Sequence, residues 1–179
     1  VILAMPSPAW GPKARQSIVT TAMHVLTKEG VVQLSRLDRE IREGATASPD
    51  AIRKVFPGLE TGSQRAIETE MHLLSAMRGR QVDPYLGYRL GLLGGVVAGV
   101  TAPLATEAAG VRNRYYDDVD RNIGQVTLKY GVRKFVDPEV YFTRVRQLAE
   151  ARTPLIIKDY QEGLGFEGVA KAMLPEDSS

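Results

Sequence analysis

The sequence of 179 residues contains no cysteine and only two histidines, His24 and His72. The absence of cysteine excludes disulfide bonds, thiolate nucleophiles and zinc sites with cysteine ligands. Two imidazoles are also too few for a zinc site that one chain would build from three histidines. The chain therefore lacks the residues for a complete catalytic or metal site of any type that we can recognise, and we expect no cofactor.

An excess of charge of one sign is also lacking. The 23 basic and 21 acidic residues leave a formal net charge of +2, and they are interspersed along the chain. Nucleic-acid-binding domains usually carry a strongly basic face or stripe, so we expect no nucleic acid among the partners. Hydrophobic residues make up 44% and charged residues 25% of the chain, which are ordinary values for a globular protein.

Helix starts are the clearest local signal that the sequence does contain. A small polar residue before a helix accepts hydrogen bonds from its free amides, and a proline at the first position needs no donor. This pair occurs four times, as Ser48-Pro49, Asp83-Pro84, Asp137-Pro138 and Thr153-Pro154. Helix ends are predicted at glycines 30, 44, 79 and 131, because glycine readily takes the left-handed conformation that closes a helix.

Apolar residues spaced by three and four positions predict the helices themselves. The first spans about 11–29, a second contains Leu34, Leu37 and Ile41, a third spans 49–56, and later helices span 138–151 and 154–163. A further helix would bury Ile67, Met71, Leu74 and Met77 and turn Arg65, Glu68 and Glu70 outward. Residues 125–130 alternate in character and could form a strand instead of a helix, but no other segment is a clear partner strand.

These patterns predict an all-α fold, a single-domain multi-helix bundle over residues 10–174 with a central glycine-rich helix. Residues 175–179 would be a frayed tail. Residues 1–9 begin with an apolar run and continue as Pro6-Ser7-Pro8-Ala9. They are either an extended arm or the end of a signal peptide, and the second alternative predicts an exported, periplasmic protein.

A ladder of glycines marks the central helix. Gly87, Gly91, Gly95 and Gly99 recur every four residues and would form one bare stripe. Each costs about 1 kcal/mol relative to alanine in a helix interior, so close approach of another helix has to compensate. Because residues 90–106 carry no charge, a short membrane-inserted segment is the alternative to a buried core helix.

Two segments resemble the zinc-dependent phospholipases C and single-strand-specific zinc nucleases, which are all-helical hydrolases. Trp10-Gly11 before a helix is similar to the start of their mature chains. Their central helix carries histidine, aspartate four residues later, proline four further and histidine two after that. Here the same frame contains Gly95, Gly99, Pro103 and Ala105.

The resemblance implies a trinuclear zinc site, but glycine and alanine offer no ligand atoms. The early histidine of the family falls on Arg15, or at a longer spacing on His24. If the ancestry holds, the chain is a metal-free, non-catalytic descendant whose helices close over the vacated site. A divergent zinc-dependent phosphodiesterase or phospholipase is the alternative, and its metal residues would include Trp10, Asp50 and His72.

Residues 112–121 combine arginine, tyrosine and aspartate. Arg112, Arg114, Tyr115 and Tyr116 form a predicted protein-contact patch, because tyrosine and arginine are favoured at interfaces. The aspartates that follow would pair along a helix, Arg114 with Asp118 and Asp117 with Arg121; a site for a hard cation is the less favoured interpretation.

The sequence thus predicts a non-catalytic helical structural or accessory subunit of a larger exported or membrane-associated assembly. Other protein subunits are the expected partners, and the apolar arm over residues 1–9 would bind either a partner or a membrane surface. The two alternatives are the divergent zinc hydrolase and a small membrane subunit anchored by the glycine-ladder helix.

Overall fold

The structure is a computed structural model that describes residues 10–28, 34–77, 82–105, 107, 109–126 and 137–168. This part of the chain contains helices and no strands, which confirms the all-α prediction. The longer helices are α1 (Pro12–Lys28), α4 (Gln64–Ala76), α5 (Pro84–Val100), α6 (Ala109–Asn122) and α7 (Pro138–Gln161). The shorter helices α2 (Asp38–Ala45) and α3 (Pro49–Val55) are accompanied by the 3₁₀ turns η1 (Leu34–Leu37), η2 (Leu59–Thr61) and η3 (Ile123–Gln125).

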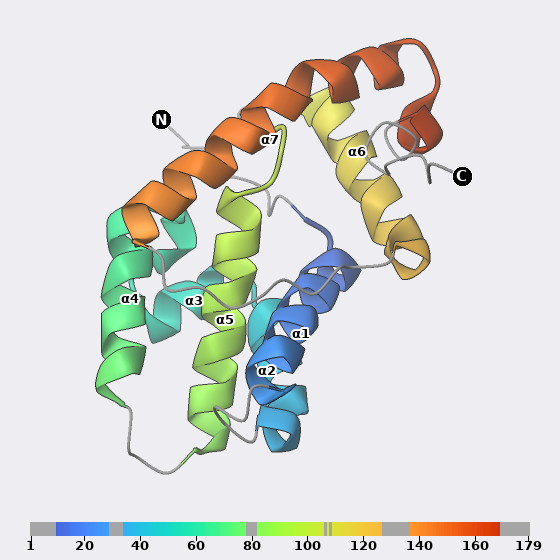
Figure 1. Cartoon of the computed structure of the whole chain (residues 1–179). Helices are drawn as coiled ribbons and strands as arrows, with labels where there is room; N and C mark the ends of the chain where they lie inside the picture. The colour runs from blue at the N-terminus through green and yellow to red at the C-terminus, as the bar shows by residue number, and fades with distance from the viewer. Residues whose placement is uncertain are drawn as a thin grey trace.

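Helix α5 occupies the centre of the molecule. Figure 1 shows α4 on one side of it and α1 with α2 on the other. The long helix α7 crosses one end of this group, and α6 lies against the far half of α7 (Figure 1). Three apolar clusters form the core: one around α5 with α3 and α4, one between α1 and α2, and one where α6 meets α7.

Three of the four predicted helix starts are confirmed by their caps. The side chains of Ser48, Asp83 and Asp137 accept hydrogen bonds from the third residue of α3, α5 and α7, at 3.2, 2.8 and 3.1 Å. The fourth prediction is wrong, because α7 continues through Pro154. Thr153 does not cap a new helix; its hydroxyl donates to the carbonyl of Ala149 at 3.2 Å, within the same helix.

The glycine ladder lies where α5 meets α2. A Cβ added to Gly91 would stand 2.0 Å from the carbonyl oxygen of Ile41, and one at Gly95 would stand 2.5 Å from that of Ala45. At Gly87 an added Cβ would meet the Leu37 side chain at 2.9 Å. Glycine therefore allows two backbones to approach more closely than any side chain would permit. Gly99 differs, because nothing lies within 4 Å of the position of its Cβ.

The helix end predicted at Gly44 falls one residue early, because α2 ends at Ala45, and Gly44 does not have the positive φ of a glycine that closes a helix. Gly44 is buried inside α2, and an added Cβ would lie 2.1 Å from the carbonyl oxygen of Tyr88 on α5. The residue thus belongs to the same close contact, seen from the other helix. The other predicted stops, glycines 30, 79 and 131, lie outside the described residues, as does most of the alternative strand at 125–130.

The prediction that Glu70 points outward from α4 is wrong, because this residue forms a buried ion pair. Glu70 is 0% exposed and binds the guanidinium of Arg89 on α5 through both carboxylate oxygens. The bond from Arg89 Nε to Glu70 Oε1 is 2.6 Å long. Met71, which the apolar spacing assigned to the core, is 37% exposed. The helix is thus rotated so that a charged residue with a partner faces inward.

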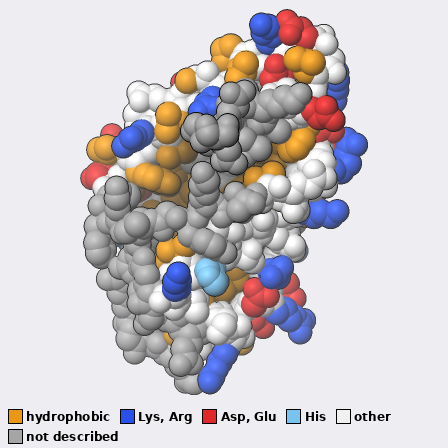
Figure 2. All heavy atoms as spheres, turned by 45° about the vertical axis from the view of Figure 1, so that its right-hand side comes forward, with side chains coloured by type: hydrophobic (Ala, Val, Ile, Leu, Met, Phe, Trp, Pro, Cys, Tyr) orange, Lys and Arg blue, Asp and Glu red, His pale blue; other side chains and the backbone are white. Residues whose placement is uncertain are grey.

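The prediction of a membrane anchor in the glycine-ladder helix is not supported. Helix α5 has 17 residues, and none of the helices in the described part of the chain is both long and apolar enough to cross a membrane. On the face shown in Figure 2, basic and acidic side chains of the described residues are intermixed, and neither sign gathers into a large patch.

Candidate functional site

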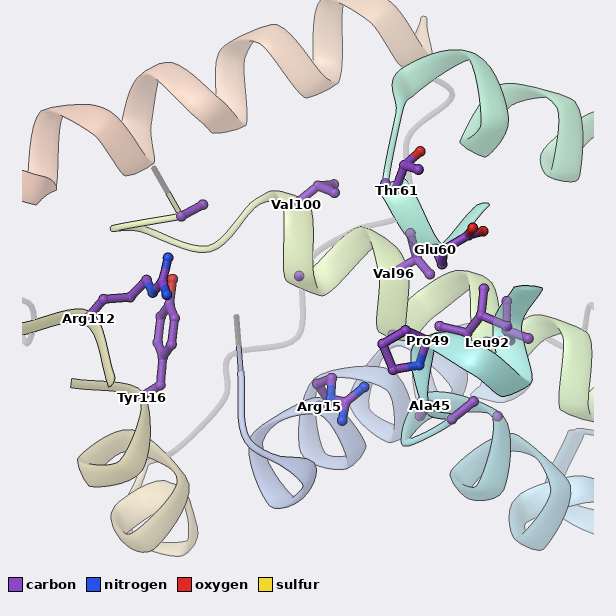
Figure 3. Close-up of a pocket in the computed structure, with 17 residues that line it drawn as sticks. Arg15, Ala45, Pro49, Glu60, Thr61, Leu92, Val96, Val100, Arg112 and Tyr116 are labelled. Carbon is purple, nitrogen blue, oxygen red and sulfur yellow. The ribbon is translucent and has the colours of Figure 1, made fainter. Parts of the chain in front are cut away.

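A cavity of about 170 Å³ opens beside the second half of α5. Residues from α1, α2, α3, η2, α5 and α6 surround it, and Figure 3 shows how they face one another. Exposed Thr61 and Ala105 are among its lining residues, so the cavity reaches the surface of the protein. The lining comprises Arg15, Gly44, Ala45, Ala47, Pro49, Ile52, Glu60, Thr61, Gly62, Leu92, Gly95, Val96, Gly99, Val100, Ala105, Arg112 and Tyr116.

One wall of the cavity is apolar. Leu92, Val96 and Val100 come from α5 (Figure 3). Ile52 comes from α3. Leu92, Val96 and Ile52 also belong to the central apolar cluster, so their positions are set by core packing. The glycine stripe adds room, because Gly99 presents no side chain to the space. This wall suits an apolar body rather than a polar substrate.

Two arginines form the other side. Arg15 belongs to α1 and Arg112 to α6, and each has a buried Nε atom without a hydrogen-bond partner. Arg112 donates one hydrogen bond through its terminal nitrogen, to the carbonyl of Glu107 at 3.2 Å. Within the described residues neither guanidinium forms an ion pair of the kind that binds Arg89. Buried donors of this kind are rare in folded proteins and call for an explanation.

Asp120 positions the start of α1 and with it Arg15. Its carboxylate accepts a hydrogen bond from the backbone nitrogen of Ala14 at 2.8 Å, from a residue 106 positions away in the sequence. A side chain at Gly11 would collide with this carboxylate, since an added Cβ would lie 2.3 Å from Asp120 Cγ. Burial lowers the pKa of Arg15, and the nearby charge of Asp120 opposes that shift.

Tyr116 links the cavity to an aromatic cluster. Its hydroxyl donates to the carbonyl of Pro103 at 2.6 Å, and burial raises its pKa to about 12 even though Arg112 lies near. The ring of Trp10, the only tryptophan in the chain, lies 5.3 Å from that of Tyr116. Trp10 therefore reports on a residue of the cavity wall.

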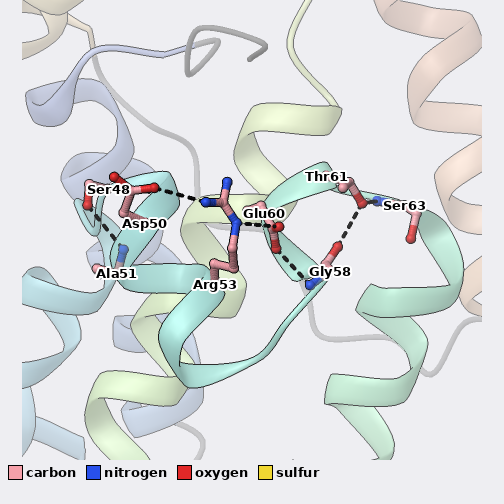
Figure 4. A network of polar contacts seen from close by, with 8 residues as sticks. All are labelled: Ser48, Asp50, Ala51, Arg53, Gly58, Glu60, Thr61 and Ser63. Atoms are coloured by element: carbon pink, nitrogen blue, oxygen red, sulfur yellow. Dashed lines mark hydrogen bonds and ion pairs between the residues drawn. The ribbon is translucent and has the colours of Figure 1, made fainter. Parts of the chain in front are cut away.

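The carboxylate of Glu60 already has partners. It accepts hydrogen bonds from Arg53 Nε at 3.0 Å and from the backbone nitrogen of Gly58 at 2.8 Å (Figure 4). Burial alone would raise the pKa of Glu60, but these bonds bring it below its ordinary value. Arg53 also pairs with Asp50 at 3.1 Å. The acidic side chain at the cavity is thus an ionised acceptor with one donor on each oxygen, and it stabilises the loop before α4.

The residues assigned to the alternative metal site lie on separate elements. Trp10 packs on Tyr115 and Tyr116 before α1, Asp50 pairs with Arg53 on the exposed side of α3, and His72 is exposed on α4. No three His, Asp or Glu side chains of the described residues are grouped so that they would hold a metal ion.

The predicted protein-contact patch on α6 is wrong for its tyrosines. Tyr115 and Tyr116 are 3% and 5% exposed and form the core between α6 and α7. Arg112 faces the cavity, and Arg114 lies over the ring of Tyr160 at 5.4 Å. The four residues therefore point to different surroundings instead of sharing one exposed surface.

The predicted charge pairs on α6 are also corrected. Arg121 pairs with Asp118 at 2.6 Å and bonds only the backbone carbonyl of Asp117. Asp118 accepts in addition from the hydroxyl of Tyr160 on α7, at 2.8 Å. Arg114 lies over the ring of Tyr160 and is not the ion-pair partner that the structure gives Asp118. The aspartates thus connect α6 to α7 and to α1 rather than forming a cation site.

Sequence reasoning missed the cavity, although it named several of its residues. The lining includes Gly95, Gly99 and Ala105, which the predicted resemblance matched to metal-ligand positions. It also includes Arg15, one of the two residues matched to the early histidine of that family, and not the other, His24. Arg112 had no comparable signal, because a lone arginine in a charged helix looks like any surface residue.

A scan against protein-family models, a search of curated proteins and a search of solved structures each found no match for the chain.

Proposed function

We propose that this chain is a non-catalytic helical accessory protein that binds a small, mainly apolar molecule in the cavity beside α5. The observation that carries the proposal is the cavity itself, about 170 Å³ in volume, with one apolar wall and two arginines opposite. Apolar cavities of about 150 Å³ are large enough to bind a molecule such as benzene. A ligand with on the order of ten non-hydrogen atoms therefore matches this space.

The resemblance to zinc hydrolases supports this proposal in a specific way. The frame matched from the sequence contained Gly95, Gly99, Pro103 and Ala105, and all of these but Pro103 line one space in the fold. Arg15, the alternative to His24 for the early histidine, lines the same space. A degenerate relative was expected to close its helices over the vacated site, and α2 does approach α5 closely at Gly95. At Gly99 and Ala105 such a relative would instead retain open space of this kind. In that case the space would bind a ligand without converting it.

Titration with a neutral probe tests the proposal. Octanamide has an apolar tail and no charge, and we expect it to change the fluorescence of Trp10 saturably, because that ring packs on Tyr116 of the cavity wall. The variant Gly99→Leu should abolish the change, because the leucine side chain would fill the cavity that Gly99 lines. It would not collide with the core, since nothing lies within 4 Å of the position of its Cβ. Gly99→Ala is the matched control and should still bind.

Two results would overturn the proposal. Equal responses of the wild-type chain and Gly99→Leu would place any binding outside the cavity. Stoichiometric zinc in protein purified without chelators would favour the divergent hydrolase instead, and Trp10, Asp50 and His72 would then be the first residues to replace.

A second candidate function is supported by the surface of α7. Val140, Tyr141 and Leu148 are 67%, 46% and 58% exposed, and their spacing places them on one side of the helix, with exposed Arg144 between them. A stripe of apolar side chains around an arginine fits an accessory subunit that binds another protein of an exported or membrane-associated assembly.

This candidate predicts a loss of assembly when the stripe becomes charged. A tagged wild-type chain isolated from its natural host should elute in a complex larger than the chain alone. The double variant Tyr141→Glu and Leu148→Glu should elute as the free chain, because charged residues are excluded from interface cores. Thr143→Glu adds a negative charge at an exposed position on the side of α7 away from Tyr141 and Leu148, and it should retain the complex. Elution of the wild-type chain alone would remove this candidate.

A further inference from the structure

The arginine side of the cavity carries information about the ligand that the proposed function leaves open. Arg112 has no carboxylate partner among the described residues, and its buried Nε atom has no acceptor. Its guanidinium donates a hydrogen bond to the carbonyl of Glu107, which carries no charge. A cation in this condition favours an acceptor from outside the chain, because a buried donor without a partner is destabilising.

Arg15 adds a second donor on the α1 side of the cavity. Its Nε atom is likewise buried and without a hydrogen-bond partner. Asp120 lies close enough to act on its charge, but the Asp120 carboxylate is also engaged by the backbone of Ala14. Figure 3 shows Arg15 below the space, and Arg112 with Tyr116 on the α6 side of it.

Among the described residues that line the cavity, no carboxylate competes with an incoming anion for the donors of Arg112. Glu60 is the only acidic residue in this described lining, and its two oxygens are bound by Arg53 and Gly58. The space between the arginines and α5 is therefore positive at one side and apolar at the other. That polarity selects amphipathic anions over both neutral apolar molecules and free inorganic ions.

We propose that the ligand is an aliphatic carboxylate, with its carboxylate toward Arg112 and Arg15 and its chain along Leu92, Val96 and Val100. This inference rests on the proposed function, since it names the ligand class of the same cavity. Guanidinium groups bind carboxylates through two parallel hydrogen bonds, so the free donors of Arg112 match the head of such a ligand.

Octanoate and octanamide test the inference, because they have the same number of non-hydrogen atoms and differ in charge. We expect the wild-type chain to bind octanoate about tenfold more tightly than octanamide, measured by Trp10 fluorescence and by calorimetry. Acetate, which has the head without the chain, should not bind measurably. Arg112→Gln should remove the preference for octanoate while octanamide binding persists, and Arg112→Lys should retain part of it.

Arg114→Gln is the matched control, because it removes the same charge from the same helix at a residue that faces Tyr160. It should leave the preference unchanged. Equal affinity of the wild-type chain for octanoate and octanamide would overturn the ligand class while the cavity function stands. A preference that survives in Arg112→Gln and in Arg15→Gln would also overturn it. Failure of both probes to bind would overturn the proposed function, and this inference with it.

Discussion

Gly91→Ala is expected to destabilise the fold by about 3 kcal/mol or more, at the upper end of the range for overpacked sites. The added Cβ would lie 2.0 Å from the carbonyl oxygen of Ile41 and 2.9 Å from its Cα atom. These are backbone atoms of α2, so no side-chain rotation can relieve the collision. The two helices would have to separate along the whole contact that also includes Gly44 and Gly95. Chemical denaturation followed by circular dichroism measures the loss.

Gly99→Ala provides the internal comparison, on the same helix and the same stripe. Nothing lies within 4 Å of the added Cβ, so only helix propensity changes. The variant should be more stable than the wild type by up to about 1 kcal/mol. Effects of opposite sign at the two positions would establish that close packing, not glycine content, determines the stability of α5. Similar losses at both positions would contradict the α2–α5 contact.

Glu70→Ala should cost about 3–5 kcal/mol, because it leaves the guanidinium of Arg89 buried without its counter-ion. Glu70 is fully buried and the Arg89 side chain is 11% exposed. Among the described residues, Arg89 would retain the hydroxyl of Tyr85 at 2.6 Å and the ring of Tyr85 at 5.5 Å as its partners. The hydrogen bonds of this carboxylate raise the pKa of Arg89, and that contribution is lost in the variant. Arginine nevertheless stays protonated near neutral pH because its ordinary pKa is far higher, so the variant leaves a buried charge. Thermal and urea denaturation measure the change.

Two controls separate the burial of this pair from ion pairing in general. Glu43→Ala breaks the exposed pair with Arg39, whose side chains are 54% and 84% exposed, and should change stability by less than about 1 kcal/mol. The double variant Glu70→Leu and Arg89→Met should recover most of the loss, since apolar residues of similar size often replace a buried ion pair without cost. A double variant as unstable as Glu70→Ala alone would show that the pair is needed for specific packing.

Local signals explain what could be predicted about the helices. Ser48, Asp83 and Asp137 cap helices in the structure because capping involves only the amides of the next three residues. Thr153 has the same signal and does not cap, because α7 packs on α4 at one end and on α6 at the other. One continuous helix satisfies both contacts, and a new start at Pro154 would break it.

Long-range partners explain the errors in orientation. We predicted an outward position for Glu70 because it is charged. Its burial depends on Arg89, which is 19 residues away and cannot be found from the spacing within one helix. The exposed position expected for Tyr115 and Tyr116 followed from their neighbours Arg112 and Arg114. Their actual surroundings include Trp10 and Tyr160, which come from opposite ends of the described chain. Helical spacing identifies a face, but it does not say what lies opposite.

The sequence by itself determined the helical class, most helix starts and the bare stripe of Gly87, Gly91, Gly95 and Gly99, because each depends on residues within a few positions of one another. Only the tertiary structure decided what the stripe does: three of its glycines contact α2, and Gly99 opens onto a cavity. Arg15 and Arg112 face that cavity from helices almost 100 residues apart. Convergence over such a separation depends on how helices pack, and the periodicity of a single helix contains no information about it.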